Sequence, residues 1–432
     1  MPKNTKLTGQ PVICQLLSFL PRQIVDFCVS EHQSDRYYKT MTTWKQLVFM
    51  LYGVVTKCHS LNSLCKNLLF LEDRLTYLGI DKLPAVSTLS DANMNRDNRV
   101  FESVYQQLLD HYKEELRPVE SSYLKKQVDT ERIMIVDSST ISLFVDVYKG
   151  AGRNPITGKK KGGLKIHAKL PLGGSVPDLI HLTEAACNDK SFLGQLTAEK
   201  GAIYVFDKGY VKYRKWKEWS EKGIYFVTRL NDNADYQVLE GKPNHISDYA
   251  DGGIISDQVI MLNPSKEPLR ARLIKYKDPA SGKVLEFVSN MFDYGDSTVI
   301  LLYKYRWNIE TLFKQLKQNF ELGYFYSDSL EGIKTQVWIA LIANLLFSVI
   351  HRQCKEAEQF VTIVNMAAIN MCSYISLIKL VKSGRLSRLE RDLQKIQFEL
   401  FDLTKGVFLR IQKIPLNLNI KRDFRILLIL VG

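Results

Sequence analysis

The chain has 432 residues and a formal net charge of +13, with 59 Lys and Arg against 46 Asp and Glu. Its length allows a large core that is divided over two or three domains. Its charge favours a polyanionic partner, although general solubility or attraction to a membrane surface would also explain it.

Secretion and membrane insertion are not predicted. The seven cysteines form no C-x-x-C pair and are odd in number, as expected for the reduced thiols of a cytosolic protein. The N-terminus carries no charged and then apolar signal segment. The longest apolar run, residues 337–350, is short and contains Asn344, so it predicts a core helix rather than a membrane span.

Residues 1–125 are predicted to form a helical N-terminal domain. Apolar residues recur at three-to-four spacing over residues 44–55, 61–71 and 100–116. The unit that starts at Ser87 opens with hydroxyl residues that can cap a helix. A helix-turn-helix-like DNA reader and a helical scaffold or dimerisation domain both fit this pattern. The DNA reader would use Lys39, Lys45, Lys57 and Lys66 as phosphate contacts, and Arg96 and Arg99 follow the unit that starts at Ser87.

Two continuous apolar runs end in an aspartate, and they predict strands that are buried on both faces. Residues 132–136 lead into Asp137, and residues 202–206 lead into Asp207. An aspartate at the end of a strand is, by itself, most often only a turn former or a cap for the next helix. On adjacent strands, however, the two carboxylates would lie within reach of each other.

The chain around these runs predicts a mixed sheet with helices. Half-exposed strands are expected at residues 163–170 and 176–183, and short helices at residues 189–198 and 212–222. A last strand is expected at residues 224–229. His167 is expected to touch DNA or to be a satisfied polar group, because no second His or Cys has the spacing of a metal site.

The segment of residues 148–169, between the apolar runs that end at Asp137 and Asp207, contains no acid. Its glycines predict a flexible loop over its first part. Such a loop is commonly just solvated, but beside two carboxylates it is also suited to contacting phosphates. The predicted phosphate contacts are Arg153, Lys159, Lys160, Lys161 and Lys165.

Residues 231–296 are predicted to be a β-strand insertion. Strands are expected at residues 236–239, 254–262, 269–276 and 284–289, with turns between them. Solvated strand faces and DNA contacts explain its charged residues about equally well. The candidate contacts in and next to the insertion are Arg229, Asn231, Arg270, Arg272 and Lys275.

Residues 303–317 contain neither Gly nor Pro and carry apolar residues at helical spacing, which predicts one amphipathic helix. At about 100° per residue, Tyr303, Arg306, Glu310 and Lys317 fall on a strip roughly 60° wide beside the apolar arc. Arg306 and Glu310 alone are typical of a surface ion pair. Beside two aspartates, the Glu can instead ligate a hard cation while Arg and Lys hold phosphate oxygens.

The chain after residue 317 is predicted to be mostly helical, over residues 337–353, 360–371 and 375–399. The last of these helices carries basic residues at three-residue steps: Lys379, Lys382, Arg385, Arg388 and Arg391. This basic face predicts a contact with DNA or with a partner subunit, or simply a solvated surface.

The spacing of Tyr303, Arg306, Glu310 and Lys317 resembles the YREK signature of the DDE transposases in the family named for insertion sequence four. The contexts of Asp137 and Asp207 resemble this family's first and second catalytic aspartate motifs. The resemblance covers residues 130–350 and, more loosely, a helical N-terminal domain of one branch.

The resemblance implies an α/β fold with a ribonuclease H-like mixed sheet flanked by helices and interrupted by the β-strand insertion. An all-helical N-terminal domain and a helical C-terminal region would complete it. The implied divisions are residues 1–125, a catalytic domain of residues 126–230 and 297–350, the insertion of residues 231–296, and residues 351–432.

The resemblance also implies that Asp137, Asp207 and Glu310 hold two Mg²⁺ ions, for which Mn²⁺ can substitute. Tyr303, Arg306 and Lys317 would grip phosphates beside the scissile bond.

The implied reaction cuts double-stranded DNA at the terminal inverted repeats of a transposon and joins the freed 3′-hydroxyls to target DNA. It would take place in the bacterial cytoplasm, at the nucleoid, in a complex that is at least a homodimer. The alternatives are a domesticated DNA-binding protein that does not cut and a metal-dependent nuclease without strand transfer. The three intact carboxylates speak against the first.

Overall fold

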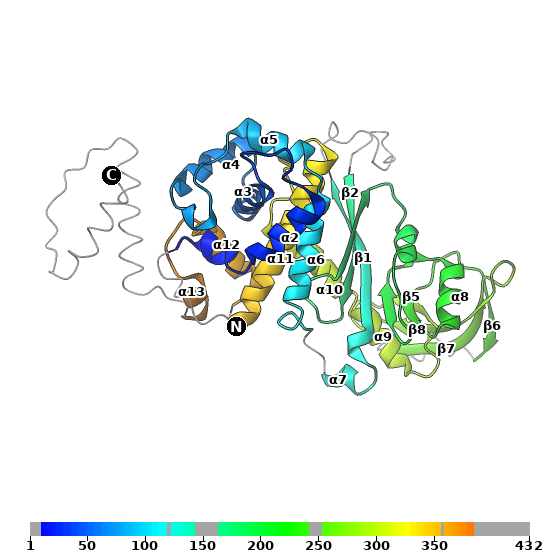
Figure 1. The fold of residues 1–432 in the computed structure, drawn as a ribbon. Coiled ribbons are helices and arrows are strands. Elements are labelled where there is room, and N and C mark those ends of the chain that lie inside the picture. Colours follow the sequence, from blue (N-terminus) through cyan, green and yellow to red (C-terminus); the bar gives the residue numbers. More distant parts are fainter. Residues whose placement is uncertain (1–9, 119–121, 143–162, 242–252, 356–357, 384–432) are drawn as a thin grey trace. The chain divides into compact units, whose positions relative to one another are not determined.

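The computed structural model describes residues 10–118, 122–142, 163–241, 253–355 and 358–383. The chain divides into two compact units, residues 1–384 and 385–432, and all the described residues belong to the first. Figure 1 draws their helices and strands. The first part of the predicted basic loop and the second half of the predicted last helix lie outside the described residues.

A mixed sheet carries the candidate catalytic aspartates. Its order over the described residues is β3-β2-β1-β4-β5-β9-β8-β7-β6. β1, β4 and β5 run parallel, and β2 and β3 are antiparallel to their neighbours. This arrangement confirms the predicted fold class. The first five strands are β1 (Ile133–Ser142), β2 (Gly163–Pro171), β3 (Leu179–Glu184), β4 (Ile203–Phe206) and β5 (Tyr225–Arg229).

The insertion extends this same sheet. β9 pairs antiparallel with β5, so that Val227 lies opposite Ser289. Each strand lies within one residue of its predicted bounds, because the alternation of apolar residues sets both the strand and its buried face. The four strands are β6 (Tyr236–Glu240), β7 (Gly253–Leu262), β8 (Leu269–Lys277) and β9 (Val284–Ser289).

Helices cover both faces of the sheet. On one face, Trp216 and Trp219 of α8 (Tyr213–Glu221) pack against Tyr204, Phe206 and Phe226. On the other face, α9 (Asp296–Lys304) packs against β4, β5 and β9, and α10 (Trp307–Asn319) packs against β1. Because side chains alternate along a strand, Asp137 points toward α10 while its neighbours Val136 and Ser138 point to the α8 face.

The single helix that was predicted over residues 303–317 is wrong. α9 and α10 are separate helices, joined by a tight turn at Tyr305 and Arg306. In this turn the Arg306 N–H donates to the Tyr303 carbonyl (3.0 Å), and the Asn308 N–H donates to the Tyr305 carbonyl (3.0 Å). These three-residue steps tighten the backbone without Gly or Pro, so the sequence carries no signal of the break.

The N-terminal part of the chain is helical, as predicted. Its α-helices are α1 (Val12–Leu17), α2 (Arg22–His32), α3 (Thr43–Val55), α4 (Leu61–Leu68), α5 (Val86–Asn95) and α6 (Arg99–His111). The predicted cap at Ser87 is wrong. α5 begins after Ala85, which makes no side-chain cap, because burial of Leu89, Ala92 and Asn93 decides where the helix lies.

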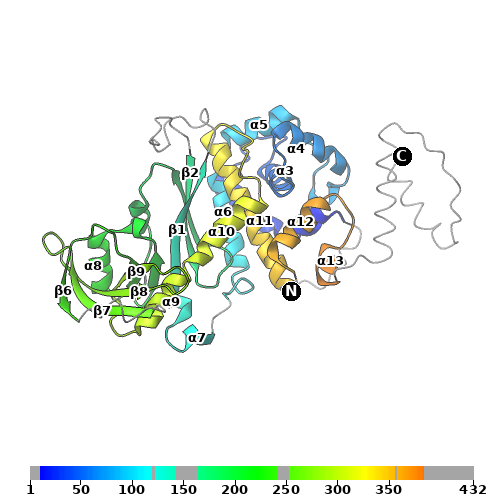
Figure 2. The ribbon, with the colours of Figure 1, turned by 180° about the vertical axis from the view of Figure 1, so that it is seen from behind.

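The long helix α11 (Leu330–Gln353) is largely buried and packs against α3, α5, α6, α10 and α12 (Phe360–Ile369). Figure 2 shows α11 beside α10 and α12. By length and composition α11 is apolar enough to cross a membrane, but 94% of its apolar window is buried inside the protein. It is a core helix, as expected for residues 337–350.

Short elements complete the described chain. The short α-helices are α7 (Ser122–Lys125) and α13 (Leu377–Ser383). The 3₁₀ helices are η1 (Leu69–Leu71), η2 (Thr76–Leu78), η3 (Thr130–Arg132), η4 (Asp189–Gly194) and η5 (Lys208–Tyr210).

We expect that replacing Gly332 with Ala lowers the stability of the fold. A Cβ at this first turn of α11 would lie 2.9 Å from the Asn93 carbonyl oxygen of α5. A backbone oxygen cannot move aside cheaply, so overpacking of about 1–3 kcal/mol should exceed the gain in helix propensity. Urea unfolding measures the difference. Gly194→Ala is the control, because a Cβ there meets no atom within 4 Å, and equal stability of both variants would contradict the packing of α11 on α5.

Candidate active site

The two aspartates lie side by side at the edge of the parallel strands. Val136 of β1 is the register partner of Phe206 of β4, so the following residues, Asp137 and Asp207, are neighbours. Asp207 follows directly after β4, as predicted. The prediction that the first strand ends at Asp137 is wrong, because residues 137–142 continue β1 alongside β2.

Arg306 brings the third acid to the first. Its Nη1 donates to Asp137 Oδ2 (2.8 Å), and its Nη2 donates to Glu310 Oε1 (2.6 Å). The guanidinium is 10% exposed. Glu310 and Asp137 are 173 positions apart in the sequence, and one planar cation holds them at the same place.

The other two members of the predicted strip also reach the aspartates or their strand. The Tyr303 hydroxyl donates to Asp207 Oδ1 (3.1 Å). Lys317 Nζ donates to Ser139 Oγ (2.7 Å) and to the Thr140 carbonyl (2.9 Å). The structure therefore brings all six predicted catalytic and phosphate-gripping residues together, while their roles stay predictions.

A cavity of about 530 Å³ opens between β1, β4 and α10. It is lined by Asp137, Ser138, Ser139, Asp207, Arg306, Glu310, Phe313, Lys314, Lys317 and Gln318. Three carboxylates (Asp137, Asp207 and Glu310) and three cationic groups (Arg306, Lys314 and Lys317) line it together. Such a cavity can accept a cation among the carboxylates and a phosphate at the rim.

Burial of several acids together sets the electrostatics of this cavity. Burial raises the pKa of Asp137 to about 6, against the opposing charge of Arg306, and the charges of Asp207 and Glu310 raise it further. Burial also raises the pKa of Tyr303 to about 12 and lowers the pKa of Lys317. The Asp137 carboxylate therefore needs a neighbouring cation to stay charged, and Arg306 is that cation.

The three carboxylates are suitable ligands for a divalent cation, but in their observed positions they do not form one binding site. Carboxylate oxygens are the ligands that hard divalent cations prefer. Within the described part of the chain, no three His, Cys, Asp or Glu side chains are grouped closely enough to hold one ion. The Arg306 guanidinium lies between Asp137 and Glu310, so the acids can share an ion only when this side chain turns away.

Of the predicted basic contacts of the loop, Lys165 alone lies in the described part of the chain. Arg153, Lys159, Lys160 and Lys161 lie outside the described residues. Lys165 is described, and the prediction that it contacts phosphate is wrong for this arrangement. Its side chain is 7% exposed, and its Nζ donates to Asp189 Oδ1 (3.0 Å) and to the Cys187 carbonyl (2.8 Å).

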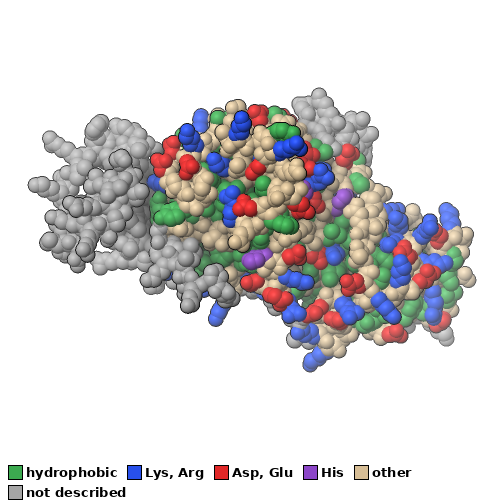
Figure 3. Space-filling model, in the orientation of Figure 1, with side chains coloured by type: hydrophobic (Ala, Val, Ile, Leu, Met, Phe, Trp, Pro, Cys, Tyr) green, Lys and Arg blue, Asp and Glu red, His purple; other side chains and the backbone are tan. Residues whose placement is uncertain are grey.

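Several other predicted DNA contacts form ion pairs with acids of the same chain. Figure 3 shows Lys and Arg side chains interspersed with Asp and Glu on the face that it draws. In the insertion, Arg270 pairs with Glu240, Arg272 with Asp257 and Lys275 with Glu286. Arg272 is buried, so its prediction as a DNA contact is wrong.

Lys57 has an unexpected structural partner. Its Nζ donates to the Gln318 carbonyl at the C-terminal end of α10 (2.6 Å). A cation at this position satisfies a carbonyl that the helix leaves free and complements the helix dipole. Lys57 was predicted as a phosphate contact, and it instead links the turn between α3 and α4 to the helix that carries Glu310.

Sequence reasoning missed residues that line or support the cavity. Lys314 stands four residues after Glu310 on the same strip, so helical spacing would have identified it. Ser138 and Ser139 belong to the first aspartate motif. Asp189, which bonds to Ser138, has no signal in the sequence, because only the packing of η4 brings it to β1.

His167 is an interior residue. It is fully buried, its Nε2 lies 2.9 Å from Thr183 Oγ1, and its ring stacks on Phe192 with centroids 5.2 Å apart. Of the two expectations for this residue, a DNA contact is wrong because the side chain has no exposed surface. Burial lowers the pKa of His167 to about 4.

Two family models match the chain. Residues 129–346 match the model described as transposase DDE domain. Residues 8–81 match a domain of unknown function, DUF4372.

Curated relatives and a solved structure add to these matches. A protein of Sinorhizobium fredii described as a transposase is 27% identical over 272 residues, which make up 62% of this chain and 72% of that protein. A protein of Synechocystis described as a transposase for insertion sequence element IS4SA is 26% identical over 268 residues, or 61% and 71% of the two chains. A piggyBac transposase synaptic complex with hairpin DNA covers 96% of this chain and 89% of its own, at 11% identity and a TM-score of 0.45. That likeness is too weak to establish a shared fold.

Protonation of His167 should destabilise the protein in acid. The unfolded chain binds this proton near the ordinary pKa of 6.5, whereas the folded chain binds it only near pH 4. Stability is therefore lost as the pH falls through this window, by up to about 3 kcal/mol. Urea unfolding at pH 7 and pH 4 should show a smaller loss for His167→Gln than for the wild type. Replacement of the exposed His111 with Gln controls for the loss of one imidazole; equal losses in wild type and His167→Gln would contradict the expectation.

Proposed function

The chain belongs to the transposase DDE domain family, and from this premise we propose that Asp137, Asp207 and Glu310 are its catalytic acids. The protein is a DDE-type insertion-sequence transposase, an enzyme that cleaves and transfers DNA strands. The single observation that carries the assignment is the meeting of the three acids around Arg306 at one cavity.

Proteins with this domain use divalent metal, and we propose that the three acids hold it here. Two Mg²⁺ ions fit the all-carboxylate donor set, and Mn²⁺ would replace them. When bound, such ions activate the attacking water or 3′-hydroxyl and stabilise the leaving oxygen. The chain itself supplies the acids on two parallel strands and one helix, which fixes their spacing.

Arg306 is proposed to exchange its partners when DNA enters. Without DNA its guanidinium neutralises Asp137 and Glu310. Its fork geometry suits two phosphate oxygens as well as it suits two carboxylates. A scissile phosphate at the rim of the cavity would draw the guanidinium outward, which frees the acids for metal at the moment when the substrate is present.

Tyr303, Lys317 and Lys314 are proposed to align the DNA. The hydroxyl of Tyr303 holds Asp207 and, with a raised pKa, stays protonated as a hydrogen-bond donor. Lys317 and Lys314 extend from α10 into the cavity that the phosphates would enter. These groups would contribute alignment and charge stabilisation rather than proton transfer.

The proposed substrates are double-stranded terminal inverted repeats of the element and a target DNA duplex. The net charge of +13 supports such a polyanionic partner. Two ends require at least a homodimer in the active complex, located in the bacterial cytoplasm with the nucleoid. In this proposal residues 1–125 recognise the ends, residues 126–230 and 297–350 carry the chemistry, residues 231–296 form the insertion, and residues 351–432 are the C-terminal region.

Replacing any one of the three acids should abolish strand cleavage. We expect Asp137→Asn, Asp207→Asn and Glu310→Gln each to lower the cleavage rate by about 10³-fold or more, because an amide is a poor ligand for a hard cation. The assay uses a duplex that carries the inverted repeats flanking the coding sequence, with Mg²⁺, and resolves cut and joined strands on a gel. Asp91→Asn, at an exposed position of α5, is the control.

The same gel separates the three functions. Cutting followed by joining supports a transposase, and cutting without joining supports a nuclease. DNA binding without any cutting by the wild type supports a binding protein. If one of the three acid variants cuts as fast as the wild type, the assignment of that acid is wrong.

Removing the Arg306 charge should strengthen metal binding by the protein without DNA. Hydrogen bonds to charged groups contribute about 1.5–3 kcal/mol, so Arg306→Gln should bind Mn²⁺ roughly tenfold tighter or more in a calorimetric titration. Its cleavage activity should nevertheless fall, because a phosphate contact is lost. Lys304→Gln removes one charge from α9, where Nζ contacts the Tyr276 hydroxyl, and is the control. Equal Mn²⁺ affinity of Arg306→Gln and the wild type would show that the guanidinium does not compete with metal.

A further inference from the structure

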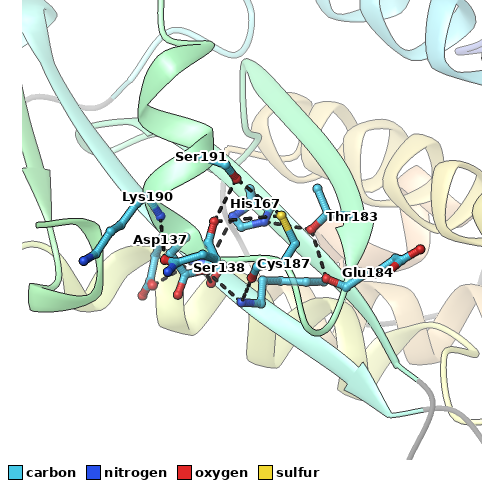
Figure 4. Close-up of polar contacts among 11 residues, drawn as sticks. Asp137, Ser138, His167, Thr183, Glu184, Cys187, Lys190 and Ser191 are labelled. Carbon is cyan, nitrogen blue, oxygen red and sulfur yellow. Dashed lines mark hydrogen bonds and ion pairs between the residues drawn. The ribbon is translucent and has the colours of Figure 1, made fainter. Parts of the chain in front are cut away.

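A buried polar cluster lies on the face of the sheet opposite to α10. We call it the Asp189 cluster, and it consists of Ser138, Lys165, His167 and Asp189. Figure 4 shows Asp137 and Ser138 beside His167 and Cys187 in this region. No member of the cluster is a predicted catalytic residue, and of its members only Ser138 also lines the active-site cavity.

Ser138 connects the cluster to the first catalytic acid. Its backbone N–H donates to Asp137 Oδ1 (2.8 Å), and its hydroxyl donates to Asp189 Oδ1 (2.8 Å). Because neighbouring side chains of a strand point to opposite faces, Asp137 meets Arg306 on one side of β1 while Ser138 meets Asp189 on the other. Contacts on both faces of the sheet therefore hold β1 in place at Asp137.

Asp189 is itself fixed by a buried cation. Lys165 Nζ donates to Asp189 Oδ1 (3.0 Å) and to the Cys187 carbonyl (2.8 Å), so the carboxylate and the chain that carries it share one donor. His167 lies beside them, with Nδ1 3.7 Å from Asp189 Oδ1. The stacked rings of His167 and Phe192 separate this side of the cluster from solvent.

The helix that carries Asp189, η4, packs against η5 of the second aspartate motif. A Cβ placed on Gly209 would lie 3.4 Å from Asp189 Oδ2, which is van der Waals distance. Gly209 belongs to η5, the turn that follows Asp207 directly. The Asp189 carboxylate therefore bonds to the residue after Asp137, while η4 packs beside the turn after Asp207.

Stability alone does not explain this cluster. The Lys165 side chain is 7% exposed and that of Asp189 24%, so both charges lose most of their hydration. Replacing such a pair with apolar residues is often neutral or stabilising. An ion pair in this place has a specific use if its hydrogen bonds set the orientation of another group.

We propose that Asp189 is a positioning residue of the reaction, which acts through Ser138 on the orientation of Asp137. This inference rests on the proposed role of Asp137 as a catalytic acid. Outer groups that orient a metal-binding carboxylate typically change activity or metal affinity by about 10–100-fold when they are removed. Asp189 touches neither DNA nor the reacting atoms in this scheme.

The test is a double-mutant cycle with Ser138→Ala, Asp189→Ala and the double variant. Each single variant should lower kcat for end cleavage by about 10–100-fold and raise the Mg²⁺ concentration for half-maximal rate, with an unchanged Kd for the end DNA. The double variant should be no slower than Asp189→Ala, because both changes remove the same hydrogen bond. Ser138→Thr, which keeps the hydroxyl, should restore most of the rate that Ser138→Ala loses.

Controls distinguish a loss of positioning from a loss of folding and from a failure of the proposed function. Ser191→Ala removes a hydroxyl from η4, the helix that carries Asp189. This hydroxyl donates to the Asn188 carbonyl, and the variant should cleave like the wild type. Circular dichroism melting identifies a variant that fails to fold, and Ser138→Ala leaves the Lys165–Asp189 pair intact, so it tests the link even if Asp189→Ala unfolds.

The outcomes are distinguishable. If the wild type does not cut, the proposed function fails. If the wild type cuts and both folded single variants keep its kcat and Mg²⁺ dependence, the positioning role is overturned. Additive losses in the double variant, or a parallel loss of DNA binding, would also overturn it, because either result means that Asp189 does not act through Ser138 on Asp137.

Discussion

The salt bridge of Arg306 with Asp137 and Glu310 is the interaction on which the candidate active site depends. It neutralises two acids that would otherwise repel each other in a poorly hydrated cavity. It also joins the sheet to α10, since one partner comes from each. The same position is the one proposed for divalent metal, so a single demand for positive charge would explain both the observed geometry and the proposed catalysis.

The rest of the fold holds the partners of this salt bridge in place. The register of β1 with β4 sets Asp137 beside Asp207. α10 is fixed at its end, where Lys57 donates to the Gln318 carbonyl and the Glu321 N–H donates to the Val54 carbonyl. Contacts from the N-terminal helices thus reach the helix that carries Glu310, which couples the segment proposed to recognise DNA ends to the acid that would act on them.

Much of the fold was predictable because local patterns report local structure. Apolar runs located β1 and β4, and alternation located the strands of the insertion to within one residue. The fate of single charges was not predictable. Lys165 and Arg272 were predicted as DNA contacts, yet each is buried against an acid that is distant in sequence or on a neighbouring strand. A charge count cannot tell a solvated cation from a paired one.

The sequence by itself determined which residue types carry the proposed chemistry, because the spacing of Tyr303, Arg306, Glu310 and Lys317 and the strands before Asp137 and Asp207 are short-range patterns. Only the tertiary structure decided how these residues meet. It broke the expected single helix at Arg306, set that guanidinium between two acids, and brought Asp189 behind Asp137. Such contacts join segments that are far apart along the chain, and packing, rather than any local preference, selects them.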